Sequence, residues 1–167
     1  MATSHPQQRR RPKVGLLAVQ CAAILTGSLL LIVGVLGFVP GITANTDGLE
    51  LAGPQSSAAL FGVFEVSVAH NLMNVAVGVL GLVLARTFAR ARAYLLVGGL
   101  LYLGLWVYGL LVNHESTANF LPVNNADTWL HLGVGVTMVL FALTLAGTRV
   151  PTGAGGEVLL PPEQLPS

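Results

Sequence analysis

The sequence has 167 residues, of which 53% are hydrophobic and only 9% are charged, with a formal net charge of +1. Because a soluble domain carries about 25% charged residues, this composition indicates a membrane protein and argues against a soluble fold. The single cysteine, Cys21, excludes an intrachain disulfide bond and a CxxC metal or redox site.

A polar N-terminal segment, residues 1–13, precedes an uncharged apolar run at 14–39. At about 1.5 Å per residue, this run is long enough to cross a hydrocarbon core of about 30 Å. A cleaved signal peptide is the competing interpretation, but its apolar core would be only about 7–15 residues long. We therefore expect a retained first helix. We also expect contact with anionic lipid, and no nucleic-acid binding, at the basic cluster of Arg9, Arg10, Arg11 and Lys13.

Further apolar runs predict three more membrane helices, at about 67–85, 93–112 and 127–146. With the first helix, they define an all-α, polytopic integral membrane protein, with four transmembrane helices bundled in one domain at 14–147. The short apolar stretch 58–66 is expected to be an interfacial or re-entrant segment that leads into the second helix. The Gly- and Pro-rich residues 148–167 predict a disordered cytoplasmic tail.

The charged residues predict which way the chain crosses the membrane. All eight basic residues lie in the N-terminal segment, in the 86–92 turn or at Arg149, whereas the loops at 40–66 and 113–126 carry only acidic charges. By the positive-inside rule, this distribution predicts a multi-pass protein of the cell membrane with both termini in the cytoplasm and both acidic loops outside.

The second and fourth helices carry similar patterns of polar residues. Segments 70–79 and 127–136 align without gaps, so that polar residues and a glycine recur one turn apart in both. This pattern predicts two parallel helical hairpins, related by an axis along the membrane normal. Chance similarity stays open as the alternative, because the first and third helices match poorly.

A group of polar residues is expected within about two turns of the outer surface, where polar side chains need partners. We predict that they form a layer facing the bundle interior, made of His70, Asn71, Asn74, Asp127 and His131. Asp127 also fits a helix N-cap or first turn, with His70 or His131 as its partner. Close approach of the helix backbones is expected at Gly78, Gly133 and Gly135.

Short motifs in these segments resemble those of a known family. The first helix ends in Gly-Phe-Val-Pro-Gly at 37–41, Leu-Phe-Gly-Val-Phe-Glu-Val follows at 60–66, and an Asp-x-Trp-Leu-His motif lies at 127–131. Over residues 16–147 the sequence resembles a four-helix membrane family of actinobacteria, known as domain of unknown function 4383. The family's His-Asn-Leu-x-His motif departs here at Asn74, which replaces the second histidine. The resemblance implies a four-helix membrane fold and no defined activity.

No catalytic motif such as GxSxG, HExxH, a P-loop or a Rossmann fingerprint occurs. The leading interpretation is a non-enzymatic integral membrane protein with a structural or accessory role, either alone, as a homo-oligomer or with a partner protein. The alternative is a redox or ligand-binding membrane protein that holds haem, metal or quinone at His70 and His131. A zinc site would also need Asp127 and Glu65, and a small-solute permease would need more than one four-helix protomer, so both are less favoured. The lack of ionisable groups near the membrane midplane also argues against a proton-driven transporter.

Overall fold

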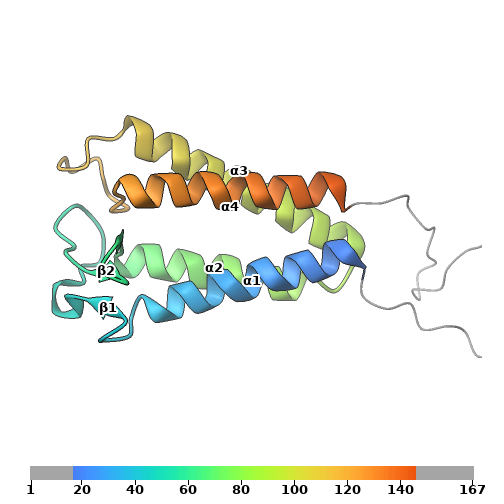
Figure 1. The fold of residues 1–167 in the computed structure, drawn as a ribbon, viewed down its shortest axis with the longest axis horizontal. Coiled ribbons are helices and arrows are strands. Elements are labelled where there is room, and N and C mark those ends of the chain that lie inside the picture. The colour runs from blue at the N-terminus through green and yellow to red at the C-terminus, as the bar shows by residue number, and fades with distance from the viewer. Residues whose placement is uncertain (1–16, 146–167) are drawn as a thin grey trace, which may run out of the picture. The chain divides into compact units, whose positions relative to one another are not determined.

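The computed structural model describes residues 17–145, which form four helices with a small three-stranded sheet at one end (Figure 1). The helices are α1 (Ala18–Leu36), α2 (Val68–Leu84), α3 (Phe88–Leu111) and α4 (Asn125–Thr144). By length and composition α1, α3 and α4 can each cross a membrane, and α2 is a shorter apolar helix of 17 residues. The expected all-α membrane fold is therefore confirmed. The basic cluster at 9–13 and the tail at 148–167 lie outside the described residues.

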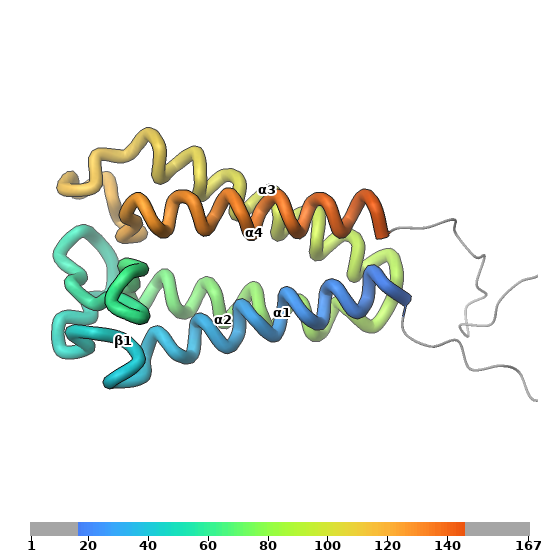
Figure 2. Tube along the Cα trace, in the orientation of Figure 1, coloured from blue at the N-terminus to red at the C-terminus, as the bar shows by residue number. Residues whose placement is uncertain are grey.

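The four helices are arranged as two antiparallel hairpins, α1 with α2 and α3 with α4 (Figure 2). Each pair is held by glycines at which the backbones touch. A Cβ atom added at Gly78 would lie 2.7 Å from the carbonyl oxygen of Gly27, and one added at Gly135 would lie 3.0 Å from that of Gly99. Gly78 and Gly135 occupy equivalent positions in the aligned segments of α2 and α4, so the two hairpins pack through equivalent contacts. This agrees with the repeated-hairpin hypothesis.

Gly133 does not take part in this packing. It is exposed, and a Cβ atom added there would meet nothing within 4 Å. Residues two apart in a helix point in nearly opposite directions, so Gly133 and Gly135 cannot both face α3. The expectation that Gly133 lets two helices approach closely is therefore wrong.

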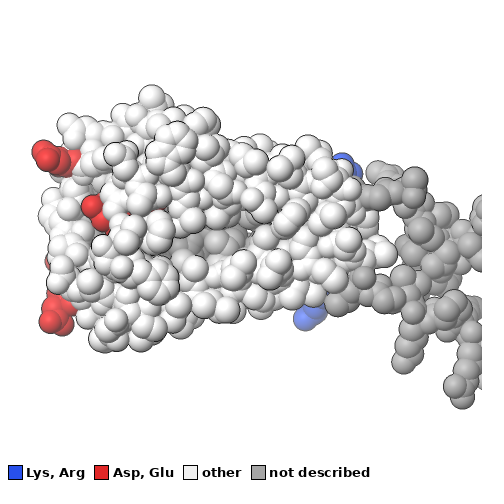
Figure 3. Space-filling model, in the orientation of Figure 1, with Lys and Arg blue, Asp and Glu red and all other residues white. Residues whose placement is uncertain are grey.

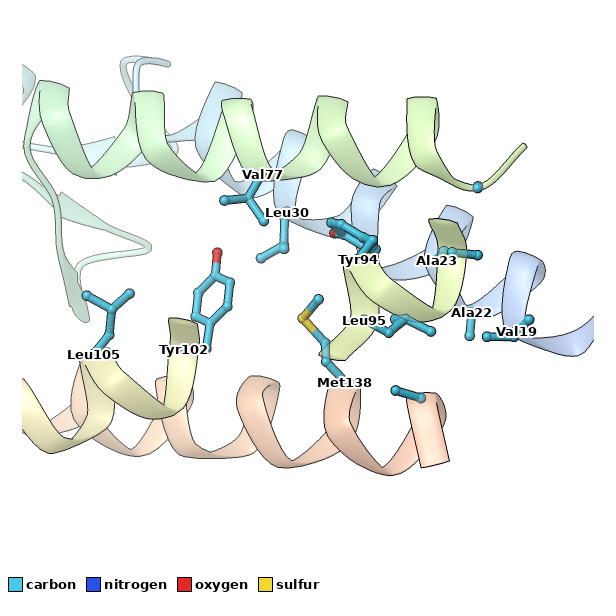
Figure 4. Packing of buried hydrophobic residues seen from close by; sticks show 13 residues of the cluster. Val19, Ala22, Ala23, Leu30, Val77, Tyr94, Leu95, Tyr102, Leu105 and Met138 are labelled. Atoms are coloured by element: carbon cyan, nitrogen blue, oxygen red, sulfur yellow. The ribbon is translucent and has the colours of Figure 1, made fainter. Parts of the chain in front are cut away.

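The apolar core lies between the two hairpins (Figure 4). Leu30 and Val77 enter it from the first hairpin, and Leu95, Tyr102 and Met138 from the second. The hydroxyl of Tyr102 is directed toward α2 (Figure 4). On the outside, many apolar side chains stay exposed on all four helices, as a surface that contacts lipid requires.

Charged side chains of the described residues lie only at the two ends of the bundle (Figure 3). Arg86, Arg90 and Arg92 lie at the end that holds the α2–α3 turn, here called the turn end. The opposite end, here called the loop end, holds the loops 37–67 and 112–124. It carries the acidic residues Asp47, Glu50, Glu65, Glu115 and Asp127.

The loop end is more regular than expected. Strands β1 (Thr43–Ala44), β2 (Ala59–Leu60) and β3 (Phe64–Glu65) form an antiparallel sheet in that order, and η1 (Thr46–Gly48) is a single 3₁₀ turn. The stretch 58–66 is thus a tight β-hairpin and not a re-entrant segment. Its turn reverses the chain through positive φ angles, 54° at Phe61 and 70° at Gly62, and cross-strand pairing then satisfies its backbone.

Two helices begin earlier than expected. The side chain of Thr87 caps α3, so Arg90 and Arg92 lie within the helix and the turn before it is shorter. Arg92 donates from Nε to the carbonyl oxygen of Ala142 at 3.1 Å, near the C-terminus of α4. Asn124 is the N-cap of α4, and Asp127 therefore lies in its first turn.

Candidate functional site

The predicted polar residues are buried in the loop-end half of the bundle. Only 1–5% of the surface of each is exposed, for His70, Asn71, Asn74, Asp127 and His131. They come from α2 and α4, which belong to different hairpins. Four of the five therefore meet across the boundary between the hairpins, and the fifth, Asn71, does not.

The two histidines are in direct contact. The centroids of the His70 and His131 rings lie 5.6 Å apart, with the ring planes tilted by 43°. Tyr102 of α3 packs on His131 with a centroid distance of 5.7 Å, and its hydroxyl donates a hydrogen bond of 2.6 Å to Oδ1 of Asn74. Three helices from both hairpins thus contribute to one group, here called the polar cluster: His70, Asn74, Tyr102, Asp127 and His131.

Tyr102 was not singled out by the sequence. Tyr94, Trp106 and Tyr108 lie nearer the ends of the third apolar run and fit the aromatic residues of a membrane interface. Tyr102 lies in its middle, where a phenol hydroxyl needs a buried partner. Its position in the middle of the run therefore indicated a buried hydroxyl with a partner. In the structure, that partner is Asn74 on another helix.

Asp127 is oriented by the backbone around it. Its Oδ2 accepts hydrogen bonds from the backbone N–H groups of Asn124 and Glu65, each at 3.0 Å, and its own N–H is capped by Asn124. This is a capping box, in which the first-turn side chain reaches back toward the N-cap. The expected hydrogen bonds from Asp127 to His70 or His131 are absent among residues 17–145, because the carboxylate points back along the chain.

Asn71 lies outside the polar cluster and packs against α1. A Cβ atom added at Gly37 would overlap the side-chain amide of Asn71. One step along a helix rotates a side chain by about 100°, which turns Asn71 away from α4 and toward the C-terminal end of α1. Glycine is therefore required at position 37.

A cavity of about 300 Å³ adjoins the polar cluster. All five cluster residues line it on one side, and the rest of its wall is apolar. The apolar lining comes from α1, α4 and the β2–β3 hairpin, and consists of Leu29, Leu30, Val33, Leu60, Phe61, Phe64, Val66, Leu130 and Val134. Leu60 and Val66 are almost fully buried, so the hairpin covers this cavity at the loop end.

A second cavity, of about 370 Å³, lies beside the first and shares four lining residues with it: Leu29, Leu30, Leu130 and Val134. Its remaining lining is also from α1 and α4, and includes Trp129, Gly133 and Met138. The hollow between the two hairpins is visible in Figure 3. The two cavities are thus adjacent, and the second adjoins the outward-facing side chains of Leu29 and Trp129.

Two ring nitrogens in the polar cluster have no partner. Nδ1 of His70 and Nδ1 of His131 are buried and make no hydrogen bond with any of the described residues. A neutral imidazole has one donor and one acceptor nitrogen, and its tautomer is set by its surroundings. Buried polar atoms are almost always paired, so these two indicate a hydrogen-bonding capacity that the chain itself does not use.

The geometry does not favour a metal or a haem between the histidines. Within residues 17–145, no three His, Cys, Asp or Glu side chains lie together in a way that could hold a metal ion. A haem ligated by both histidines would need its macrocycle between the two rings, which are already in contact. A haem at this position would require α2 and α4 to separate.

Fold and site together define an integral membrane protein built from two helical hairpins with a buried polar cluster between them. A family model described as "Domain of unknown function (DUF4383)" matches residues 20–144. The chain therefore belongs to this family, as its motifs predicted. No curated protein and no solved structure matches the chain.

Proposed function

We propose that this protein is a non-enzymatic, accessory component of the cell membrane whose polar cluster fixes the two helical hairpins against each other. The observation that carries the proposal is the buried 2.6 Å hydrogen bond from Tyr102 to Asn74, which joins α3 to α2. The contact between the rings of His70 and His131 joins α4 to α2 at the same depth. Both interactions cross from one hairpin to the other.

The polar cluster determines how the two hairpins are aligned more than it adds to the free energy of unfolding. Hydrogen bonds between membrane helices contribute about 0.6 kcal/mol on average and about 1.7 kcal/mol at most. Within each hairpin the glycine contacts bring backbones together, and van der Waals packing supplies the attraction. Between the hairpins the packing is sparser, and α4 in particular makes few backbone contacts with α1 and α2. A few directional bonds at this boundary therefore select one arrangement of the hairpins.

We also propose an orientation of the protein in the membrane. Arg86, Arg90 and Arg92 gather at the turn end and the acidic residues at the loop end. The positive-inside rule then assigns the turn end and both termini to the cytoplasm. The polar cluster lies in the outer leaflet in this orientation. The basic residues Arg9, Arg10, Arg11 and Lys13 contact anionic lipid headgroups on the cytoplasmic side.

The test compares two tyrosine-to-phenylalanine variants on the same helix. Tyr102→Phe removes the buried hydroxyl and leaves Oδ1 of Asn74 without its donor. We expect a loss of about 0.6–1.7 kcal/mol in the free energy of unfolding, measured by denaturant titration in detergent micelles. Tyr108→Phe is the matched control, because its hydroxyl bonds to the carbonyl oxygen of Ala118 in the loop that follows α3. Equal stability of Tyr102→Phe and the unmodified protein would contradict the proposal that the polar cluster fixes the two hairpins against each other.

A further inference from the structure

We propose that the two cavities form a binding site for an uncharged, lipid-soluble molecule whose head carries a carbonyl or hydroxyl oxygen, as a quinone does. The head lies against the polar cluster in the first cavity, and the apolar body lies in the second, between α1 and α4. The site shares side chains with the polar cluster that fixes the hairpins, but it uses polar atoms of those side chains that make no bond between the hairpins.

Unpaired hydrogen-bonding atoms identify the head-group end. His70 and His131 are more than nine-tenths buried and line the first cavity, and Nδ1 of each lacks a partner among the described residues. Asn74 uses Oδ1 for Tyr102, and Asp127 uses Oδ2 for two backbone N–H groups. Within residues 17–145 the Nδ2 of Asn74 and the Oδ1 of Asp127 make no hydrogen bond. The site therefore offers both donors and acceptors to one oxygen-bearing head.

The charge around the cavity selects a neutral head. None of the residues that line the two cavities is a lysine or an arginine. A phosphate or carboxylate head would thus be buried without a countercharge and beside Asp127, at a large cost in free energy. A carbonyl or hydroxyl group needs only hydrogen-bond partners. The volume of about 300 Å³ lies at the small end of the range for small-molecule sites.

The residues that line the two cavities indicate that the ligand enters from the lipid. Leu60 and Val66 of the β2–β3 hairpin close the first cavity toward the loop end, with 2% and 3% of their surfaces exposed. The second cavity is lined by residues that face outward, including Leu29 and Trp129, with 54% and 61% exposed. Since α1 and α4 make few contacts with each other, the opening between them is the natural path for an apolar molecule.

The experiment uses the fluorescence of Trp129, which lines the second cavity. The full chain, with Trp106→Phe to leave a single tryptophan, is reconstituted in lipid nanodiscs and titrated with 2-methyl-1,4-naphthoquinone. We expect saturable quenching of Trp129. Quenching that rises in proportion to the quinone in the bilayer, without saturation, would overturn the proposal, because it reports partitioning alone.

Two glycine variants test the path. Gly133→Leu places a side chain in the second cavity, and nothing lies within 4 Å of its Cβ atom. Gly104→Leu on α3 is the matched control, equally unobstructed and lining neither cavity. We expect at least tenfold weaker binding in Gly133→Leu and unchanged binding in Gly104→Leu. Equal binding by both variants would overturn the proposed path.

The head-group chemistry is tested by a third variant and by competition. His131→Phe keeps a ring but removes both nitrogens, and we expect at least tenfold weaker binding with helical circular dichroism unchanged. Displacement of the quinone by a long-chain alcohol, and not by the fatty acid of equal length, supports a neutral oxygen head. Displacement by the fatty acid at equal or lower concentration, or unchanged binding in His131→Phe, would overturn that assignment.

Discussion

At the scale of single residues, burial decides which polar and small side chains matter. Asn74 and Tyr102 pair in the core, whereas Asn71, three residues before Asn74, packs against Gly37 of α1. Two glycines of α4 differ in the same way. Gly135 lies against the backbone of α3, and Gly133 faces the second cavity. Side-chain direction around the helix, and not residue type, makes the difference.

Alanine substitutions at these two glycines have opposite expected outcomes. In Gly135→Ala the new Cβ atom would lie 2.9 Å from the backbone nitrogen of Leu103 and 3.0 Å from the Gly99 carbonyl oxygen. We expect a loss of about 1–3 kcal/mol in unfolding free energy, as overpacking of a close contact causes. Gly133→Ala should be neutral or slightly stabilising, because nothing obstructs it. Thermal unfolding in detergent measures both, and equal destabilisation would contradict the α3–α4 packing described.

At the scale of elements, the first turn of α4 joins the β2–β3 hairpin to the bundle. Asp127 accepts from the N–H of Glu65, and Nδ2 of Asn124 donates to the carbonyl oxygen of Val63 at 2.7 Å. These bonds connect the loop of the first hairpin to a helix of the second. They also hold the hairpin over the first cavity, so the capping box of α4 positions the wall of that cavity.

Removal of the Asp127 carboxylate should loosen this junction. In Asp127→Ala the Glu65 amide loses its acceptor and α4 loses its capping box, at a cost of about 0.5–2 kcal/mol. We expect hydrogen exchange of the Glu65 amide to accelerate roughly tenfold, the factor that corresponds to about 1.4 kcal/mol.

Two variants control for this result. Asp127→Asn retains a side-chain oxygen acceptor and should lose less than half of the protection at Glu65. Glu115→Ala removes an exposed acid of the same end of the bundle and should leave the exchange unchanged. Equal exchange in Asp127→Ala and Glu115→Ala would mean that the carboxylate does not hold the hairpin.

At the scale of the whole molecule, charge segregation and apolar surface define how the bundle of residues 17–145 sits in lipid. Charged side chains lie at its two ends, and the surface between them is uncharged (Figure 3). An uncharged zone of this kind is what a hydrocarbon core requires. The sign difference between the ends is the basis for the proposed orientation.

Cysteine labelling tests this orientation. In a Cys21→Ser background, single cysteines are placed at exposed positions of the two ends, Thr117→Cys at the loop end and Ala89→Cys at the turn end. A membrane-impermeant maleimide added to intact cells should label Thr117→Cys only, and Ala89→Cys should react only after permeabilisation. Labelling of Ala89→Cys in intact cells would reverse the proposed topology.

The sequence by itself determined the class of protein, the number of helices and the family, because long apolar runs and short motifs are local properties of the chain. It also pointed to His70 and His131, since polar groups are rare in such runs. It did not predict the β2–β3 hairpin, whose strands are only two residues long and depend on pairing with each other.

Only the tertiary structure decided which polar residues meet. The contact of the histidines, the Tyr102–Asn74 bond and the bond from the Glu65 N–H to Asp127 all join residues of different helices or loops. The cavity exists because two closely packed hairpins leave space between them. Such features depend on how the helices are rotated and packed, which a hydropathy pattern does not specify. The acid–histidine pair of α4 therefore proves to be two residues with separate partners on the wall of one cavity.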